Sequence, residues 1–321
     1  MAGLPRAPVR GSPGRILAAP APLWSPLVNL PAIKHRLVSG FSIAAVLFTV
    51  FFLMPDVAAP FILAALAAVM ALEFYRLMTA AGIPNFDRYG VLGCVALVGV
   101  TWFAGWRTGH GADGAWDAVV LFLIVIGIFL RQFPQKDNPA PLQTIGGTLF
   151  GVLYIGLLWS FMGKLILFGR PAAFEGIYWP GRWLLLYAVF AAKFTDIGAY
   201  LVGCVLGRHK LIPRISPAKS WEGVFGGIVI GTLAGTLLVW GLEFSAYPLG
   251  RLGLTPLRAI PLGIFLSVCA VVGDLVESLF KRAAAVKDSG GIVPGMGGTL
   301  DVLDSILFTA PGVYLFLRLV A

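Results

Sequence analysis

Long apolar runs dominate the chain from residue 38 to its C-terminus. A helix of about 17 to 25 apolar residues can cross the roughly 30 Å hydrocarbon core of a bilayer. Strands of a membrane β-barrel alternate between apolar and polar residues, and these runs do not. The pattern therefore predicts an all-α, polytopic integral membrane protein with about nine transmembrane helices. The runs lie near residues 38–54, 57–79, 89–106, 116–131, 142–168, 181–206, 224–244, 257–281 and 303–319.

Composition divides the chain into two parts. Residues 1–36 are basic and rich in proline and alanine, so we expect a mobile N-terminal tail. Its prolines interrupt any apolar core that a signal peptide would need. Residues 37–321 form one predicted transmembrane domain, and the polar residues that carry chemistry gather in 190–305. Only 12% of the whole chain is charged, against about 25% in soluble domains.

The distribution of Lys and Arg predicts the orientation of the helices. With the N-terminus in the cytoplasm, the inside segments carry 16 Lys and Arg and the outside segments carry six. Basic residues favour the cytoplasmic side, so we expect the N-terminus inside and the C-terminus outside. The compact chain fits a prokaryotic inner membrane. Topology and anionic lipid account for the net charge of +9, and nucleic acid is not an expected partner.

Ionisable residues lie inside two of the apolar runs, where each costs about 2.5 to 3.5 kcal/mol near the bilayer centre. Spacings of three, four or seven residues place each set on one helix face. One interpretation is that each face points toward a polar cavity or polar partners and marks a functional site. The alternative is that Lys193–Asp196 and Glu277–Lys281 are ion pairs that only hold helices together. The two sets are Lys193, Asp196 and Tyr200 in 181–206, and Asp274, Glu277, Ser278 and Lys281 in 257–281.

Two predicted cytoplasmic loops carry further polar side chains. Residues 207–223 combine cations with hydroxyl and backbone donors, which favours a polyphosphate-binding loop, although the cations could simply set topology. Residues 288–305 contain five glycines, which let a backbone approach a ligand. The first loop offers Lys210, Arg214, Ser216, Lys219 and Glu222, and the second is flanked by Arg282, Lys287 and Asp288.

Acidic residues at the ends of the last two runs predict a metal site. Asp274 lies about two turns before the cytoplasmic end of its run, and Asp301 lies at the start of the next. Carboxylates from two helices suit Mg²⁺, which completes its shell with phosphates and water. We therefore expect Asp274 and Asp301 as ligands, Asp304 as support and Lys281 as a metal-neighbouring or phosphate contact. A second cation remains open, and the buried acid Glu73 has no assigned role.

The segment SLFKRAAAVKDSGGIVPGMGGTLDVLD, residues 278–304, resembles the C-terminal signature of the phosphatidate cytidylyltransferases. TDIGAYLVG, GRHKL, RISPAKSWEG and the GD at 273–274 also resemble motifs of that family. Met296 stands where the family usually has histidine, and Val302 where it usually has arginine. These departures remove two phosphate or proton contacts and leave the carboxylates and lysines of the predicted metal site in place.

The resemblance implies transfer of a cytidylyl group from CTP to phosphatidic acid, with Mg²⁺, giving CDP-diacylglycerol and pyrophosphate. It also implies a homodimer that takes its lipid substrate from the membrane. Besides Asp274, Asp301, Asp304 and Lys281, the expected nucleotide and phosphate contacts come from the 207–223 loop and from the residues flanking the glycine-rich segment 289–298, which we call the glycine turn. Asp196 and Asp288 could instead be structural partners of Lys193 and Lys287.

Three alternatives use similar residues. A CDP-alcohol phosphatidyltransferase needs an upstream D-G-x-x-A-R array that the sequence does not contain. A CTP-dependent lipid kinase would transfer the γ-phosphate instead of the cytidylyl group. A secondary transporter would use intramembrane Asp and Lys for ion movement, but its site lies near the midplane between repeats. Here the polar groups gather toward one side, and the sequence has no evident internal repeat.

Overall fold

The structure is a computed structural model that describes Phe48, Phe52 and residues 55–108, 115–171, 179–293 and 297–320. The predicted tail at 1–36, most of the first apolar run and Met296 lie outside the described residues. Within the described part the fold is all-α apart from one short hairpin. The predicted fold class is therefore confirmed.

Eight spans in the described residues are long and apolar enough to cross a membrane. They coincide with the second to ninth predicted runs, so the count of nine depends on the undescribed run at 38–54. One span, Pro141–Ile166, is built from α5, a π-helical turn η2 and α6. The elements are α2 (Ala59–Ala80), α3 (Asp87–Thr108), α4 (Ala115–Gln132), α5 (Pro141–Gly151), η2 (Val152–Leu157), α6 (Leu158–Ile166), α7 (Trp179–Leu206), β1 (Lys210–Ile212), β2 (Ser216–Ser220), α8 (Trp221–Glu243), η3 (Leu249–Leu252), α9 (Pro256–Ala283) and α10 (Thr299–Val320).

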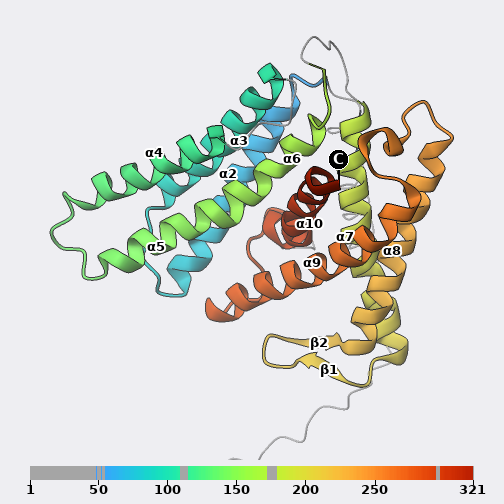
Figure 1. The fold of residues 1–321 in the computed structure, drawn as a ribbon. Coiled ribbons are helices and arrows are strands. Elements are labelled where there is room, and N and C mark those ends of the chain that lie inside the picture. Colours follow the sequence, from blue (N-terminus) through green and yellow to red (C-terminus); the bar gives the residue numbers. More distant parts are fainter. Residues whose placement is uncertain are drawn as a thin grey trace, which may run out of the picture.

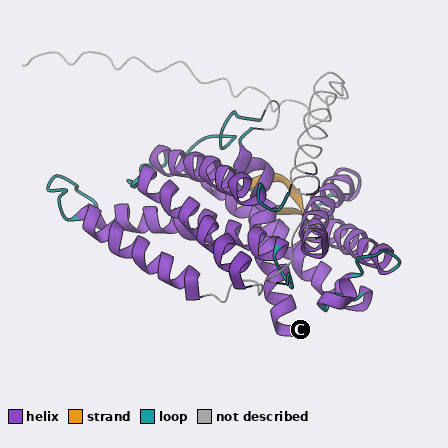
Figure 2. Ribbon diagram, turned by 90° about the horizontal axis from the view of Figure 1, so that it is seen from above, coloured by secondary structure: helices purple, strands orange, loops and turns teal. Residues whose placement is uncertain are grey.

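The helices form two groups with α10 between them (Figure 1). Helices α2 to α6 pack together on one side, and α7 packs closely against α8 on the other. Helix α10 contacts α6, α7 and α9, so it joins the two groups. Figure 2 shows the helices from above, packed side by side. The first turns of α10 consequently lie where both groups can reach them.

Glycines allow α7 and α8 to pack closely. Helix α8 has glycine at every fourth position from Gly223 to Gly235, on the face toward α7. A Cβ atom added at Gly227 would lie 2.7 Å from the backbone oxygen of Thr195. Small residues at such spacing let membrane helices approach at backbone distance. This packing fixes the β1–β2 hairpin, which connects the two helices, at the end of the pair.

Buried ion pairs occupy the opposite end of the bundle from the hairpin. Lys164 of α6 pairs with Asp117 of α4, which also accepts a 2.6 Å hydrogen bond from Thr101 of α3. Arg182 of α7 pairs with Asp56, and both side chains are almost fully buried. Arg182, one of the six Lys and Arg assigned to outside segments, lies near the start of α7, away from the hairpin, and binds this buried carboxylate. Such pairs fix helix ends against one another because either partner alone would be a buried charge.

Candidate active site

Three carboxylates from two helices converge near the hairpin end of the bundle. Asp274 and Glu277 lie on one face of α9, and Asp304 lies in the second turn of α10. Ligand atoms from the three residues lie within 4.8 Å of one another. Gly273 makes this possible, because a Cβ atom there would lie 2.7 Å from the backbone oxygen of Asp304. We refer to Asp274, Glu277 and Asp304 as the acid cluster.

Asp301 lies beside the acid cluster in a different set of contacts. Its carboxylate is 2.6 Å from the ammonium group of Lys281. It also accepts hydrogen bonds from the Ser289 N–H at 2.8 Å, the Ser289 hydroxyl at 2.8 Å and the Gly298 N–H at 2.6 Å. Asp301 thus organises the glycine turn, while Asp304, expected only as support, lies with Asp274. The ligand role of Asp301 stays a prediction.

Gly297 explains part of the glycine content of that turn. Its backbone φ is +99°, a conformation that favours glycine over residues with a Cβ atom. An added Cβ would also lie 2.6 Å from the Asp301 carboxylate. The turn therefore needs glycine both for its backbone and for the close approach of Asp301.

Lysines lie beside the acids, and both predicted pairs, Lys193–Asp196 and Glu277–Lys281, are present. Each lysine also makes further contacts. Lys281 lies 2.5 Å from Glu277 as well as 2.6 Å from Asp301. Lys193 lies 3.4 Å from Asp196 and also donates to the Val302 carbonyl at 2.8 Å and the Ser305 hydroxyl at 3.1 Å. These lysines therefore belong to a network that spans α7, α9 and α10. Val302, where the family usually has arginine, contributes its carbonyl to this network.

The segment expected as a phosphate-binding loop is an antiparallel hairpin, with Lys210 paired to Ser220 and Ile212 to Ser216. Ser220 caps α8 by accepting a 3.2 Å hydrogen bond from the Gly223 N–H. Glu222 accepts from the backbone N–H groups of Arg208 and His209 and contacts the His209 ring at 2.6 Å. Glu222 thus holds the start of the hairpin to α8.

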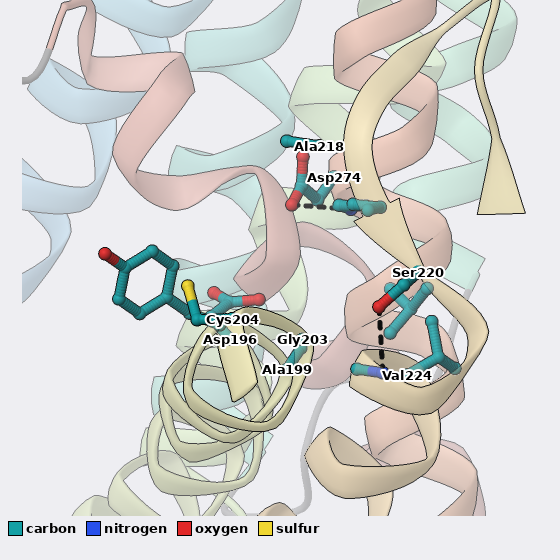
Figure 3. A pocket seen from close by; sticks show the side chains of 12 residues that line it. Asp196, Ala199, Gly203, Cys204, Ala218, Ser220, Val224 and Asp274 are labelled. Carbon is teal, nitrogen blue, oxygen red and sulfur yellow. Dashed lines mark hydrogen bonds and ion pairs between the residues drawn. The ribbon is translucent and has the colours of Figure 1, made fainter. Parts of the chain in front are cut away.

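A cavity of about 280 Å³ lies between the hairpin and helices α7, α8 and α9. Asp196 of α7 and Asp274 of α9 contribute carboxylates to different walls (Figure 3). Lys219 of β2 also lines the cavity and pairs with Asp274 at 2.6 Å. Much of the remaining wall is small or apolar, including Gly203 and Val224. The cavity therefore joins a polar end at the acid cluster to an apolar wall within the helices.

The structure brings only some of the predicted site residues together. Asp196, Lys219, Asp274, Lys281, Asp301 and Asp304 meet in the contacts above. Other predicted contacts are solvent-exposed or only partly buried on the hairpin, in the last turn of α9 and on the segment after it: Lys210, Arg214, Ser216, Arg282, Lys287 and Asp288. Arg282 does reach the hairpin, where its Nε donates to the Ile215 carbonyl at 3.2 Å.

Glu277 was not predicted as a member of the site. The sequence marks it mainly as a partner of Lys281, yet it is 1% exposed and completes the acid cluster. Its spacing of three residues from Asp274 was the available signal. The geometry offers closely spaced oxygen ligands, lysines for anions and an adjoining cavity, which suits chemistry on phosphate groups.

The sequence model of the cytidylyltransferase family matches residues 34–320. The chain belongs to the cytidylyltransferase family. It is 31% identical to a phosphatidate cytidylyltransferase of Chlamydia pneumoniae over 89% of this chain and 90% of that protein. A Mycobacterium bovis protein of the same name is 31% identical over 89% of each chain, and one from Synechocystis is 34% identical over 80% of this chain and 88% of the relative. The resemblance found in the 278–304 signature of this cytidylyltransferase is confirmed.

Proposed function

We propose that this membrane protein transfers a cytidylyl group from CTP to phosphatidic acid, forming CDP-diacylglycerol and pyrophosphate for phospholipid synthesis. The observation that carries the proposal is the acid cluster, with lysines on both sides and a cavity between helices. Relatives that match across most of the chain carry the name of this activity. Both substrates are anionic, so the enzyme must bring two phosphate-bearing molecules together.

The acid cluster fits Mg²⁺. The Oε1 atom of Glu277 is buried and receives no hydrogen bond among the described residues, as expected for an oxygen that binds a cation. Three closely spaced carboxylates also repel one another unless positive charge lies between them. Asp274, Glu277 and Asp304 would hold the ion. Asp301 would lie beside them, because Lys281 pairs with both Asp301 and Glu277. Bound Mg²⁺ would supply positive charge to phosphate oxygens and an ordered geometry for them.

The lysines have a separate part in the proposed reaction. Lys219 and Lys281 are each paired with a carboxylate, at 2.6 Å and 2.5 Å, and can exchange these partners for phosphate oxygens of CTP. An oxygen of the lipid phosphate forms the new bond to the α-phosphorus, while the bond from that phosphorus to the β-phosphate oxygen breaks. Pyrophosphate leaves with the electron pair, so no protein nucleophile is needed. The side chains position the substrates and offset their charge.

We also propose that the protein lies in a prokaryotic inner membrane, with its active site and N-terminus on the cytoplasmic side and its C-terminus outside. The excess of Lys and Arg in the segments assigned to the cytoplasm supports this orientation. A homodimer is expected from the resemblance to the family. Cysteine labelling from either side of the membrane would test the orientation, and mass measurement in detergent would test the dimer.

Purified protein in detergent tests the reaction with phosphatidic acid, Mg²⁺ and CTP labelled in either the α- or the γ-phosphate. We expect α-label in the lipid product, together with released pyrophosphate. Appearance of γ-label in the lipid would identify a lipid kinase instead. Nucleotide-independent solute uptake by reconstituted vesicles, without lipid product, would identify a transporter.

A further inference from the structure

Glu73 is a buried carboxylate in α2, outside the region expected to carry catalysis. It is 1% exposed. Its Oε1 accepts a 3.0 Å hydrogen bond from the Thr299 N–H, and its Oε2 accepts a 2.8 Å bond from the Leu300 N–H. The Ser289 hydroxyl lies within 3.5 Å of the same carboxylate. Glu73 therefore binds the glycine turn and the start of α10 from a helix more than 200 residues away in sequence.

These contacts make Glu73 an N-terminal cap supplied by another helix. The first backbone N–H groups of a helix have no partners within it, and the positive end of the helix dipole favours a carboxylate there. Asp301 accepts from the preceding Gly298 N–H, so the two acids share the donors at this terminus. Glu73 thus determines how the first turn of α10 lies against α2.

The glycine turn is shaped to admit this carboxylate. A Cβ atom added at Gly290 would lie 2.5 Å from Oε1 of Glu73, and one at Gly298 would lie 2.2 Å from the Ser289 hydroxyl and 2.7 Å from Oε2 of Glu73. By contrast, a Cβ atom at the neighbouring Gly291 meets nothing within 4 Å. Two of the glycines therefore leave room for Glu73, independently of any substrate.

We propose that Glu73 is a positioning residue that sets the placement of α10 and, through it, of Asp304 in the acid cluster. This rests on the proposed function. Asp304 lies one turn after the amides that Glu73 binds, so a shift or rotation of that first turn moves Asp304 relative to Asp274 and Glu277. Glu73 makes none of its described contacts with these three residues. Its effect on the acid cluster passes through the α10 backbone.

The test uses Glu73→Gln, which keeps the size and one acceptor oxygen but places an amide N–H against backbone donors. Glu73→Asp keeps the charge with a shorter reach and remains informative if the first variant folds poorly. Asp117→Asn is the matched control, because Asp117 is also a buried acid but lies with Lys164 at the other end of the bundle. Thermal stabilisation of the purified proteins by Mn²⁺ or Mg²⁺, without CTP or lipid, gives the metal concentration at half-saturation.

We expect Glu73→Gln to raise that concentration about 10- to 100-fold, the effect typical of losing an outer partner of a metal site. Glu73→Asp should lie between it and wild type, and the folded Asp117→Asn protein should match wild type. Hydrogen exchange at the Thr299 and Leu300 amides should accelerate in Glu73→Gln. In the cytidylyl-transfer assay, kcat at fixed Mg²⁺ should fall while KM for CTP stays within about threefold.

An unchanged half-saturation in folded Glu73→Gln would overturn the proposal, as would a wild-type protein that binds no divalent cation. If wild type binds the metal and the variant shifts it, but neither transfers cytidylyl groups, the positioning role stands and the proposed reaction fails. The metal-binding measurement therefore tests the role of Glu73, and the activity assay tests the proposed reaction.

Discussion

Lys219 of the hairpin lies 2.6 Å from Asp274 of α9. This ion pair joins two segments that the sequence could suggest only separately, a basic loop and an acidic helix face. Both side chains keep partial access to the cavity, with 22% and 33% of their surfaces exposed. Lys219 is therefore the hairpin cation best placed to meet a phosphate near the acid cluster.

Replacing Lys219 with Met should lower kcat/KM for CTP by about 10²- to 10³-fold, as expected when a group that offsets phosphate charge is removed. The substitution removes a positive charge that would meet the phosphates of CTP. It also leaves Asp274 without its ion-pair partner Lys219. Steady-state kinetics with CTP and phosphatidic acid measure the effect. Lys136→Met removes the same charge from the exposed α4–α5 connection and should change the rate less than about threefold. Equal losses in both variants would contradict a specific role for Lys219.

The two aspartates at the start of α10 should behave differently when each is changed to Asn. Asp304→Asn removes a member of the acid cluster, so we expect the Mg²⁺ concentration for half-maximal activity to rise at least about tenfold. Asp301→Asn mainly weakens the contacts to Lys281 and the glycine turn, so thermal stability should fall with a smaller change in Mg²⁺ dependence. Mg²⁺ titrations of activity, with melting curves, measure both. The reverse ranking would restore Asp301 as the ligand.

Much of the fold could be predicted because membrane helices are recognisable by their length and apolarity. The eight described spans lie where the apolar runs predicted them. The β1–β2 hairpin within the loop 207–223 was not predicted, because its strands are only three and five residues long and alternate too briefly to give a pattern. The pairing of Arg182 with Asp56 could not be predicted either, because the two residues are far apart in sequence.

The candidate site could be predicted in outline but not in its pairings. Spacing on α9 placed Asp274 and Glu277 on one face, yet the rotation of α10 decides whether Asp301 or Asp304 meets them. That rotation depends on packing, including the close approach at Gly273 and the contact with Glu73. Glu73 lies outside 190–305 and has no local motif, so its partners at Thr299 and Leu300 could be found only in three dimensions.

Close packing of α7 and α8 predicts a strong penalty for Gly227→Ala. The added Cβ would lie 2.7 Å from the Thr195 backbone oxygen and 3.1 Å from the Ala199 Cβ, so the helices must separate. Overpacking of this kind costs about 1 to 3 kcal/mol. Gly241→Ala on the same helix meets nothing within 4 Å and serves as the control. We expect a lower melting temperature in detergent only for Gly227→Ala, and equal melting temperatures would contradict the interface.

The buried pair between Asp117 and Lys164 should be important for stability and unimportant for metal binding. Asp117→Asn leaves Lys164 as a buried charge without its carboxylate partner, which costs about 3 to 5 kcal/mol. Adding Lys164→Met to that variant removes the charge, while the new amide oxygen at position 117 can still accept from the Thr101 hydroxyl, so the double variant should regain most of the stability. Melting of the single and double variants gives the coupling energy. If the stability losses of the single variants simply add in the double variant, the two side chains stabilise the protein independently, which would contradict the prediction. Recovery of stability in the double variant would show that the loss in Asp117→Asn comes from the unpaired charge of Lys164.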